Sequence, residues 1–427
     1  IRTRNALTPY ISSPRHSERS EESRSPYHFK RHAIQNCLYG VDIDPGAVEI
    51  AKLRLWLSLV VDEEERESIQ PLPNLDYKIV EGNSLLSVEK NLFNAALFSK
   101  LEELKPLYFN ETSASKKQEY RRQIDDLISQ ITNGHKDFDF EVYFSEVFHD
   151  LPARGVQAGK KGFDVVIANP PYLEARSPEF SDRMKEEAQR GANTRWGVDS
   201  EYITRGADLL IYFLELGVYL LANKGTSVFI TQNSWLDTDY GKKFQNFLLK
   251  HTNVKAIVDS DFKYFDSKLG PNINTVISLF VGKKADENNT TIFARYHENF
   301  GKVDRSILYD EANSLPTKVE LKKFKHEDPI LRTLKWGTLL SSSNEALQIV
   351  SLIDKKGKRL NQLTGYNLSI GQGLNIQKSL IIEDKVLEKF PFLSRRLIPF
   401  MTTEDGAPFV LEKTKRFIID GSQLNQV

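Results

Sequence analysis

The stretch 163–172, FDVVIANPPY, decides the fold that this chain is predicted to adopt. Its β-branched run, residues 165–167, predicts a buried parallel strand, and Pro170 and Pro171 prevent that strand from continuing. The chain must therefore leave the sheet at Asn169. Because ligands of an open α/β sheet bind beyond the carboxyl ends of its parallel strands, we expect the chemistry of the protein at this turn.

Three groups of this turn suit the binding of a planar NH2 group. The side-chain oxygen of Asn169 and the carbonyl of Pro170 can accept its two N–H donors, which localises the nitrogen lone pair and directs it at an electrophile. The ring of Tyr172 can stack on the ring that carries the amine. Two prolines after a strand can also form a stiff turn without any chemical role, so the other motifs must distinguish the two interpretations.

Length and composition limit the class of protein. With 427 residues, 40% of them hydrophobic, the chain can bury a large core, and this length predicts about two or three domains. The single cysteine, Cys37, excludes an internal disulfide framework. The longest apolar run, residues 209–221, contains Glu215 and is too short to span a membrane. We therefore expect a globular protein of the reducing cytoplasm, without a membrane partner.

Charge is distributed unevenly along the chain, although the net charge is zero. From Gly301 onward there are 20 Lys and Arg against 15 Asp and Glu. A mildly basic region permits a polyanionic partner, but a solvated surface has the same composition. At the other end, residues 1–31 are rich in Ser, Arg and Glu and show no helical or strand periodicity. We expect a disordered or non-native leader there.

Two further sheet-edge turns are predicted upstream of the first motif. Residues 37–43 (CLYGVDI) read as a strand that ends in Asp42, and Asp44 with Pro45 suits the N-cap and first turn of the next helix. An acidic residue at such a strand end is where nucleotide-binding folds bind ribose hydroxyls, although a cap or turn explains it equally well. Residues 77–80 predict another strand, followed by the polar turn Gly82-Asn83-Ser84.

The rest of the chain alternates between predicted helices and strands. Residues 89–150 interrupt the pattern with a helical insert, since apolar residues of 119–131 recur at helical spacing. An apolar helix is predicted over 208–222, ended by Lys224 and Gly225. Strands follow at 226–231, 254–259 and 274–281.

The order of these parts resembles that of the amino-methylating DNA methyltransferases. The likeness rests on GVDIDP, EGNSLL, FDVVIANPPY, ADLLIYFLELGVYLLANKGTSVFITQNSWL and NTVISLFV, and covers residues 32–285 best. It is strongest to the NPPY class of N6-adenine-specific enzymes, which includes the methylase part of combined restriction-modification type IIG enzymes. The resemblance implies an α/β fold: a Rossmann-like class I S-adenosylmethionine-dependent methyltransferase sheet and a partial C-terminal target-recognition domain.

The domains expected from this resemblance cover the chain after its leader. Residues 32–300 would form the catalytic domain, including the insert at about 89–150. Residues 301–340 would be a linker, and residues 341–427 part of the DNA target-recognition domain.

The resemblance also assigns roles to individual residues. Asp42 would bind the ribose of S-adenosylmethionine, Ile43 would lie against its adenine, and Asn83 would accept a hydrogen bond from the adenine amine. The catalytic residues would be those of the NPPY motif: Asn169, Pro170, Pro171 and Tyr172.

A second aromatic ring would pack against the flipped base from the face opposite Tyr172. Phe265 matches this position, with Phe262 and Tyr264 as rivals. Core packing is the alternative explanation for Phe265.

The activity implied is site-specific transfer of a methyl group to adenine N6 in double-stranded DNA, without a metal. The target adenine would be flipped out of the duplex, and a restriction nuclease, fused or separate, would be a partner. Because the amine proton becomes acidic only after methyl transfer, no dedicated general base is required.

One feature of the family is missing from this sequence. The glycine-rich turn that holds the methionine end of the cofactor would precede Asp42, yet the chain has no glycine before Gly40. We therefore expect a sheet without its first strand and a 427-residue chain that is inactive by itself. Two alternatives remain open: a protein-glutamine N5-methyltransferase, which the 127-residue separation of Asp42 and Asn169 argues against, and an inactive fragment that retains only DNA binding.

Overall fold

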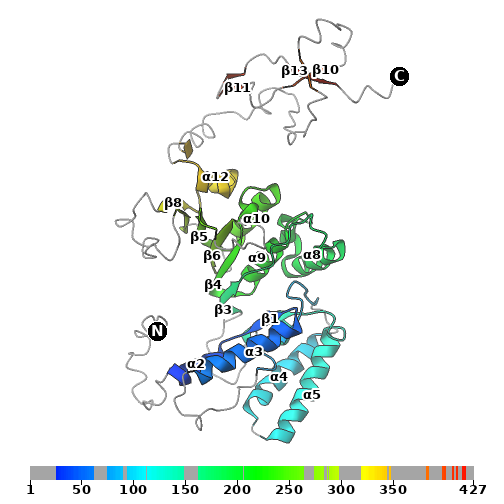
Figure 1. Ribbon diagram of the computed structural model, residues 1–427. Coiled ribbons are helices and arrows are strands. Elements are labelled where there is room, and N and C mark those ends of the chain that lie inside the picture. The colour runs from blue at the N-terminus through cyan, green and yellow to red at the C-terminus, as the bar shows by residue number, and fades with distance from the viewer. Residues whose placement is uncertain are drawn as a thin grey trace, which may run out of the picture. The chain divides into compact units, whose positions relative to one another are not determined.

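The computed structural model describes two compact units, residues 1–351 and residues 352–427, which are treated separately (Figure 1). In the first unit it describes residues 26–61, 75–89, 94–111, 113–148, 162–204, 206–263, 274–282, 286, 288–297, 319–343 and 346–347. In the second unit it describes five short strands.

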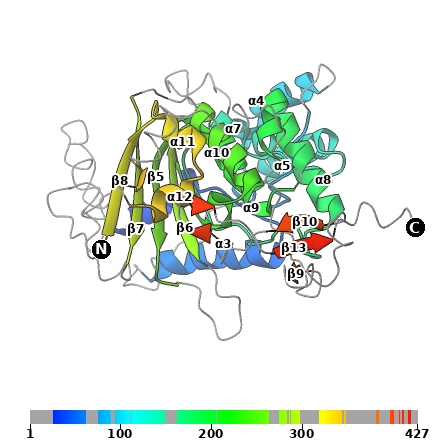
Figure 2. The ribbon, with the colours of Figure 1, turned by 90° about the horizontal axis from the view of Figure 1, so that it is seen from above.

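A six-stranded mixed sheet is the centre of the first unit (Figure 2). Its strands are β3 (Phe163–Ala168), β4 (Leu221–Gln232), β5 (Asn253–Ser260), β6 (Thr275–Val281), β7 (Thr290–Tyr296) and β8 (Val319–Lys325). They lie in the order β3-β4-β6-β5-β7-β8, with β3 parallel to β4 and β5 parallel to β7, while the other neighbours are antiparallel. With helices connecting these strands, the fold class is α/β, as predicted.

A separate pair of parallel strands precedes this sheet in the chain. β1 (Gly40–Asp42) pairs with β2 (Ile79–Glu81) in the register Val41 to Val80. The turns after the two strands are joined, because the N–H of Gly82 donates to the carbonyl of Asp42 at 2.9 Å. Both strands were predicted, and both are shorter than the sequence suggested.

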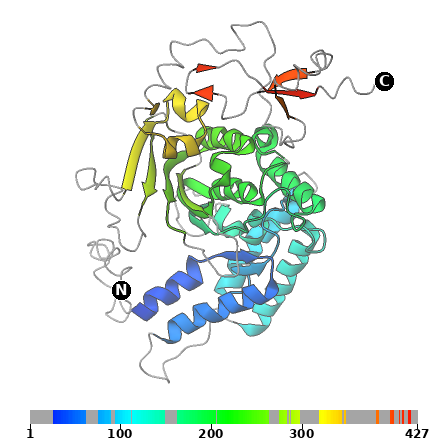
Figure 3. The same cartoon turned by 45° about the horizontal axis from the view of Figure 1, so that its top comes forward.

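Two helices pack beside this strand pair (Figure 3). α3 (Pro45–Val60) begins as predicted, with Asp44 as its N-cap: the carboxylate accepts from the N–H of Gly46 at 2.7 Å. α2 (Pro26–Asn36) corrects the expectation of an unstructured leader for residues 26–31. The helix is stabilised by burial of Tyr27 and Ile34 in a cluster shared with α3 and β2, a long-range contact that local composition does not reveal.

The insert is helical, as the spacing of its apolar residues predicted. α4 (Ala95–Asn110) and α5 (Ala114–Ile131) pack against each other, and two short helices follow, α6 (Phe140–Tyr143) and α7 (Ser145–Phe148). Buried in α5 are Ile124, Leu127, Ile128 and Ile131.

The region between β3 and β5 supplies the helices that position the candidate site. They are α8 (Asp182–Trp196), the 3-10 turn η4 (Gly197–Tyr202), α9 (Leu209–Tyr219), the 3-10 turn η5 (Ser234–Leu236) and α10 (Asp239–His251). α9 is buried on almost every side, which explains its nearly uniform apolar sequence.

The predicted end of α9 at Lys224 and Gly225 is wrong, because both residues lie inside β4. A Cβ atom at position 225 would lie 2.4 Å from the carbonyl oxygen of Phe163. The glycine therefore permits close approach of β3 and does not end the helix.

β3 is parallel to β4 as predicted, but it is not buried. Val165 is 58% exposed and Ile167 is 76% exposed. Among the described residues, β3 pairs with a strand on one side only, so its other edge is free. The β-branched run correctly indicated a strand, but it could not indicate how many neighbours that strand would have.

Residues 301–340, predicted as a linker, include β8 and two helices of the first unit, α11 (Pro329–Thr333) and α12 (Trp336–Ser341). In the second unit, β9 (Ile381–Glu383), β10 (Leu397–Phe400) and β13 (Arg416–Ile419) form an antiparallel sheet in the order β10-β13-β9. β11 (Gly406–Ala407) pairs with β12 (Val410–Leu411). No described helix combines the length and apolar character needed to cross a membrane.

Candidate active site

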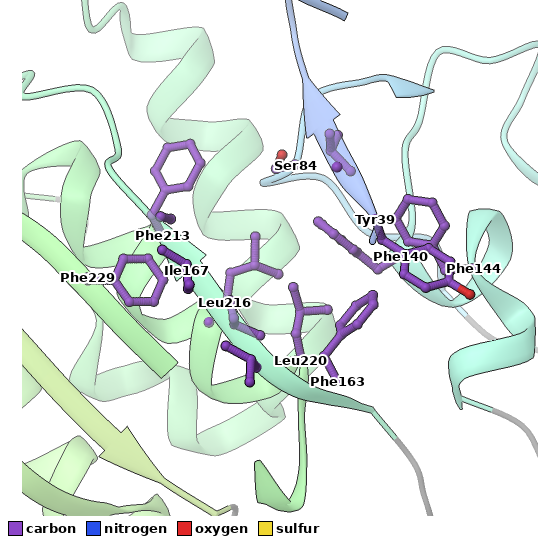
Figure 4. A pocket seen from close by; sticks show the side chains of 16 residues that line it. Tyr39, Ser84, Phe140, Phe144, Phe163, Ile167, Phe213, Leu216, Leu220 and Phe229 are labelled. Carbon is purple, nitrogen blue, oxygen red and sulfur yellow. The ribbon is translucent and has the colours of Figure 1, made fainter. Parts of the chain in front are cut away.

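A cavity of about 270 Å³ lies between β1, β3 and α9 (Figure 4). Its lining includes Val41 of β1, Ser84 of the turn after β2, and Ala168 at the end of β3. The candidate residues Asp42, Asn83 and Asn169 are the immediate chain neighbours of these three. The structure therefore brings the three predicted sheet-edge turns to the border of one cavity.

The Asn-Pro-Pro-Tyr turn has an internal hydrogen bond. The hydroxyl of Tyr172 donates to Oδ1 of Asn169 at 2.8 Å and lies 3.5 Å from the carbonyl oxygen of Ile230. Asn169 and Pro171 are exposed, whereas Pro170 is buried. Burial raises the pKa of Tyr172, so its phenol stays protonated and able to donate. An amide oxygen has two lone pairs, so Asn169 can accept a second hydrogen bond from a bound amine.

The turn after β1 presents an acidic and an apolar side chain to solvent. Oδ1 of Asp42 accepts from the N–H of Asp44 at 2.9 Å, and the carboxylate is exposed. The next residue, Ile43, is 66% exposed. Asp42 is thus a turn residue, as the simpler interpretation of the sequence held, but its second oxygen can still accept a hydroxyl group.

Asn83 also stabilises its own turn. Its Oδ1 accepts from the N–H of Leu85 at 3.1 Å. One lone pair of the oxygen proposed to bind an adenine amine is therefore already used, and the second is left for a ligand.

These residues can be compared with the two halves of S-adenosylmethionine. An exposed carboxylate beside an exposed aliphatic side chain suits a nucleoside, which offers ribose hydroxyls and a flat apolar ring. The cavity wall is mostly aromatic and aliphatic, including Phe144, Phe213 and Leu216. Such a wall does not suit the charged amino-acid end, whose burial without partners is costly.

Of the aromatic residues expected on the second face of a flipped base, Phe265 and Tyr264 lie outside the described residues. Phe262 lies two residues beyond the end of β5 and is 45% exposed, and its N–H donates to Oγ of Ser260 at 3.1 Å. No group of three His, Cys, Asp or Glu residues in the described ranges could hold a metal ion.

A buried carboxylate that the sequence analysis did not single out holds the segment after Tyr172. Oδ1 of Asp208 accepts from the N–H of Ala175 at 2.9 Å. Its Oδ2 accepts from Nε2 of Gln232 at 3.1 Å, from Oγ of Ser234 at 3.2 Å and from the hydroxyl of Tyr240. Asp208 therefore joins the start of α9 to the segment after the NPPY turn and to the end of β4. From the sequence, Asp208 is only the first residue of the predicted helix 208–222.

A buried ion pair holds the turn after β2. Arg195 of α8 is paired with Glu215 of α9, and both side chains are almost completely buried. Nη1 of Arg195 also donates to the carbonyls of Leu85 and Leu86 at 3.2 and 3.3 Å, while the indole of Trp196 donates to Glu215 at 2.6 Å. One signal of this pair is visible in the sequence, an isolated glutamate in an otherwise apolar helix.

One protein family matches the part of the chain that carries these features. The Eco57I restriction-modification methylase family matches residues 36–265. A protein of Methanocaldococcus jannaschii whose name joins a type II restriction enzyme and a methyltransferase is 24% identical over 373 residues, which cover 69% of this chain and 29% of that protein.

Two more similarities are remote. The type II methyltransferase M.BstVI of Geobacillus stearothermophilus is 22% identical over 248 residues, which cover 57% of this chain and 41% of that protein. The solved structure of the type IIG restriction endonuclease BpuSI has a TM-score of 0.36 and 14% identity, covering 92% of this chain and 54% of the endonuclease chain. This chain spans less than half the length of either named sequence relative.

Proposed function

Because this chain belongs to the Eco57I restriction-modification methylase family, we propose that its protein transfers a methyl group from S-adenosylmethionine to N6 of adenine in double-stranded DNA. The observation that carries the proposal is the NPPY turn, in which the hydroxyl of Tyr172 orients the amide oxygen of Asn169 beside the cavity between β1 and β3. A restriction nuclease, fused or separate, is the partner that this family membership favours.

On the acceptor side, the two N–H groups of the adenine amine would donate to Oδ1 of Asn169 and to the carbonyl of Pro170. Both acceptors sit on a turn that two prolines stiffen, so the nitrogen lone pair is aimed with little loss of entropy at the moment of reaction. S-adenosylmethionine supplies the electrophilic methyl group. The amine proton becomes acidic only after transfer, so it can leave to solvent and no residue has to act as a base.

The target base is inaccessible inside a duplex, so the reaction requires that it flip out. Unstacking costs about a few kcal/mol, which stacking on the half-buried ring of Tyr172 offsets in part. Phe265, or its exposed neighbour Phe262, would cover the other face of the base.

On the donor side, the exposed carboxylate of Asp42 would accept the ribose hydroxyls and Ile43 would pack against the cofactor's adenine. Asn83 would accept from the adenine amine with its remaining lone pair. The lining of the cavity contains no charged side chain that could pair with the methionine end.

The test is substitution of Asn169 in the full-length protein that contains this chain. Asn169→Ala should abolish methyl transfer from labelled S-adenosylmethionine to mixed-sequence DNA, while the affinity for S-adenosylmethionine stays within about twofold, since the residue contacts the acceptor. Nucleoside analysis of the DNA should find N6-methyladenine in the wild-type reaction.

A matched control is Asn193→Ala, an exposed asparagine of α8 that bonds to the side chain of Gln189. It should leave the reaction unchanged. Near-normal transfer by Asn169→Ala would remove the basis of the proposal, and N4-methylcytosine as the product would overturn the assignment to adenine.

A further inference from the structure

α9 and the residue before it carry two buried carboxylates, and each one fixes a different turn of the proposed site. Asp208, at its start, binds the acceptor loop, defined here as residues 169–175. Glu215, two turns further along, binds Arg195, which holds the donor loop, defined as residues 82–86. The proposed catalytic mechanism uses neither carboxylate, although both are buried and fully engaged.

The acceptor loop is attached to α9 at two points. The N–H of Ala175 donates to Asp208, and the N–H of Leu209 donates to the carbonyl of Leu173 at 3.0 Å. Asp208 accepts four hydrogen bonds in all, and a carboxylate is the only side chain of this size that offers acceptors alone. An asparagine in its place would turn an N–H2 group toward one or more of these donors.

The donor loop is attached to α8 and, through Arg195, to α9. The guanidinium divides its donors between Glu215 and the carbonyls of Leu85 and Leu86. α8 also lies directly on the loop, because a Cβ atom at Gly191 would come within 1.9 Å of the carbonyl oxygen of Leu85. A lysine could keep the charge but not this forked set of contacts.

The two attachments share no hydrogen-bond partner among the contacts that the described residues make. Asp208 and Glu215 are seven residues apart, which is about 10 Å along a helix. Perturbations at that distance without common partners are usually additive. Each attachment can therefore be changed without disturbing the other.

We propose that Asp208 is a positioning residue for the methyl acceptor and that Arg195, held by Glu215, is a positioning residue for the methyl donor. The inference rests on the proposed methyltransferase function. It adds that Asp208 and Glu215, seven residues apart, act on the positions of the methyl acceptor and the methyl donor separately. Asp208 sets the NPPY turn by fixing its downstream end to β4 and α9. Arg195 sets the turn that contains Asn83.

The two positioning roles predict that substitutions of Asp208 and Arg195 change different constants in the full-length protein. Asp208→Asn should lower kcat roughly tenfold to a hundredfold, because a shift of about 1 Å at the acceptor has that effect, and should change the Kd for S-adenosylmethionine by less than about twofold. Arg195→Lys should raise that Kd roughly tenfold while kcat at saturating cofactor changes by less than about threefold. The double variant should show both effects together.

A control separates positioning from general loss of stability. Thr252→Val removes a buried hydroxyl that donates to the carbonyl of Gly282 at 2.9 Å. This hydroxyl lies where β5 begins and β6 ends, at the ends of the strands far from the NPPY turn. It should lower the melting temperature without changing kcat or Kd. If Asp208→Asn does not fold, Tyr240→Phe and Ser234→Ala each remove one donor to Asp208 and should lower kcat alone, by a smaller factor.

The outcomes are distinguishable. A wild-type protein without methyl transfer would overturn the proposed function and this inference with it. If the wild type is active but Asp208→Asn and Arg195→Lys both change kcat, both change the Kd for S-adenosylmethionine, or change neither, only the separate positioning roles of Asp208 and Arg195 would be overturned. Kinetic losses in Thr252→Val equal to those of Asp208→Asn would show that Asp208 acts through stability alone.

Discussion

The phenol of Tyr172 has two tasks in the proposed reaction, and the structure separates the atoms that perform them. Its hydroxyl donates to Asn169, while its ring is the surface on which a base would stack. Because burial raises the pKa of Tyr172 above its ordinary value, the phenol is protonated and the hydrogen bond is present at neutral pH. The orientation of Asn169 is therefore set before any substrate arrives.

Asp42 likewise combines a structural and a proposed binding role, and the two can be separated by substitution. In the full-length protein, Asp42→Ala should weaken S-adenosylmethionine binding by about 1.5 to 3 kcal/mol, tenfold or more, through loss of a charge-assisted hydrogen bond. Asp42→Asn can still accept from the N–H of Asp44 and should lie between the wild type and Asp42→Ala. Calorimetry measures the affinities, with Asp182→Ala, a substitution of an exposed carboxylate at the start of α8, as the control. Unchanged binding by both Asp42 variants would place the ribose elsewhere.

At the scale of the elements, the contact between α8 and the donor loop depends on the absence of a side chain at Gly191. Gly191→Ala should lower the free energy of unfolding by about 1 to 3 kcal/mol, because the new methyl group would overlap the carbonyl of Leu85. The matched control is Gly206→Ala, where nothing lies within 4 Å of the added Cβ. Denaturant titration gives both values. Equal effects of the two substitutions would mean that α8 can move away from the loop without cost.

A lysine joins α10 to α11 and makes stability depend on pH. Nζ of Lys242 donates to the carbonyls of Leu331 and Leu334 at the end of α11, and burial lowers the pKa of Lys242 to about 8. Between pH 8 and about 10.5, the ordinary value, Lys242 binds more protons in the unfolded chain than in the folded one, so its contribution to the free energy of unfolding should rise with pH.

This rise should be smaller in Lys242→Met and unchanged in Lys243→Met, which alters an exposed neighbour on the same helix. Denaturant titrations at a series of pH values provide the comparison. A parallel pH dependence in the wild type and Lys242→Met would contradict the assignment.

Local patterns predicted the elements well where the cause of an element is itself local. The strand at 163–168 follows from three β-branched residues and two prolines, and the start of α3 follows from Asp44 and Pro45. α2 was missed because its apolar residues are buried only by distant elements. The end of α9 was misplaced because Gly225 serves a neighbouring strand and does not end the helix.

The same distinction applies to the candidate site. The three turns were predicted because each is a short motif at the end of a strand. Asp208 and Arg195 were not, because their partners lie up to 33 and 110 residues away and only the folded chain brings them together.

For the whole molecule, the division into two units corresponds to a predicted separation of the proposed chemistry from the recognition of the DNA sequence. All described candidate site residues lie in the first unit, residues 1–351. Most of the predicted recognition domain, residues 341–427, belongs to the second unit. Exchanging residues 352–427 for those of a relative with a different recognition site should change the methylated sequence and preserve the type of methylated base. Sequencing of modified DNA is the assay, and a retained site would show that the first unit reads the bases.

The free edge of β3 has a consequence for amide hydrogen exchange. Successive N–H groups of a strand point to alternate sides, so every second one in β3 faces β4 and the others point to the side on which β3 pairs with no described strand. In this 427-residue chain, protection should therefore alternate along 163–168, whereas β4, with a strand on both sides, should be protected throughout. β3, which leads to the NPPY turn, should therefore open locally more often than β4. Pairing of another strand with the free edge of β3 should slow the exchange of those N–H groups.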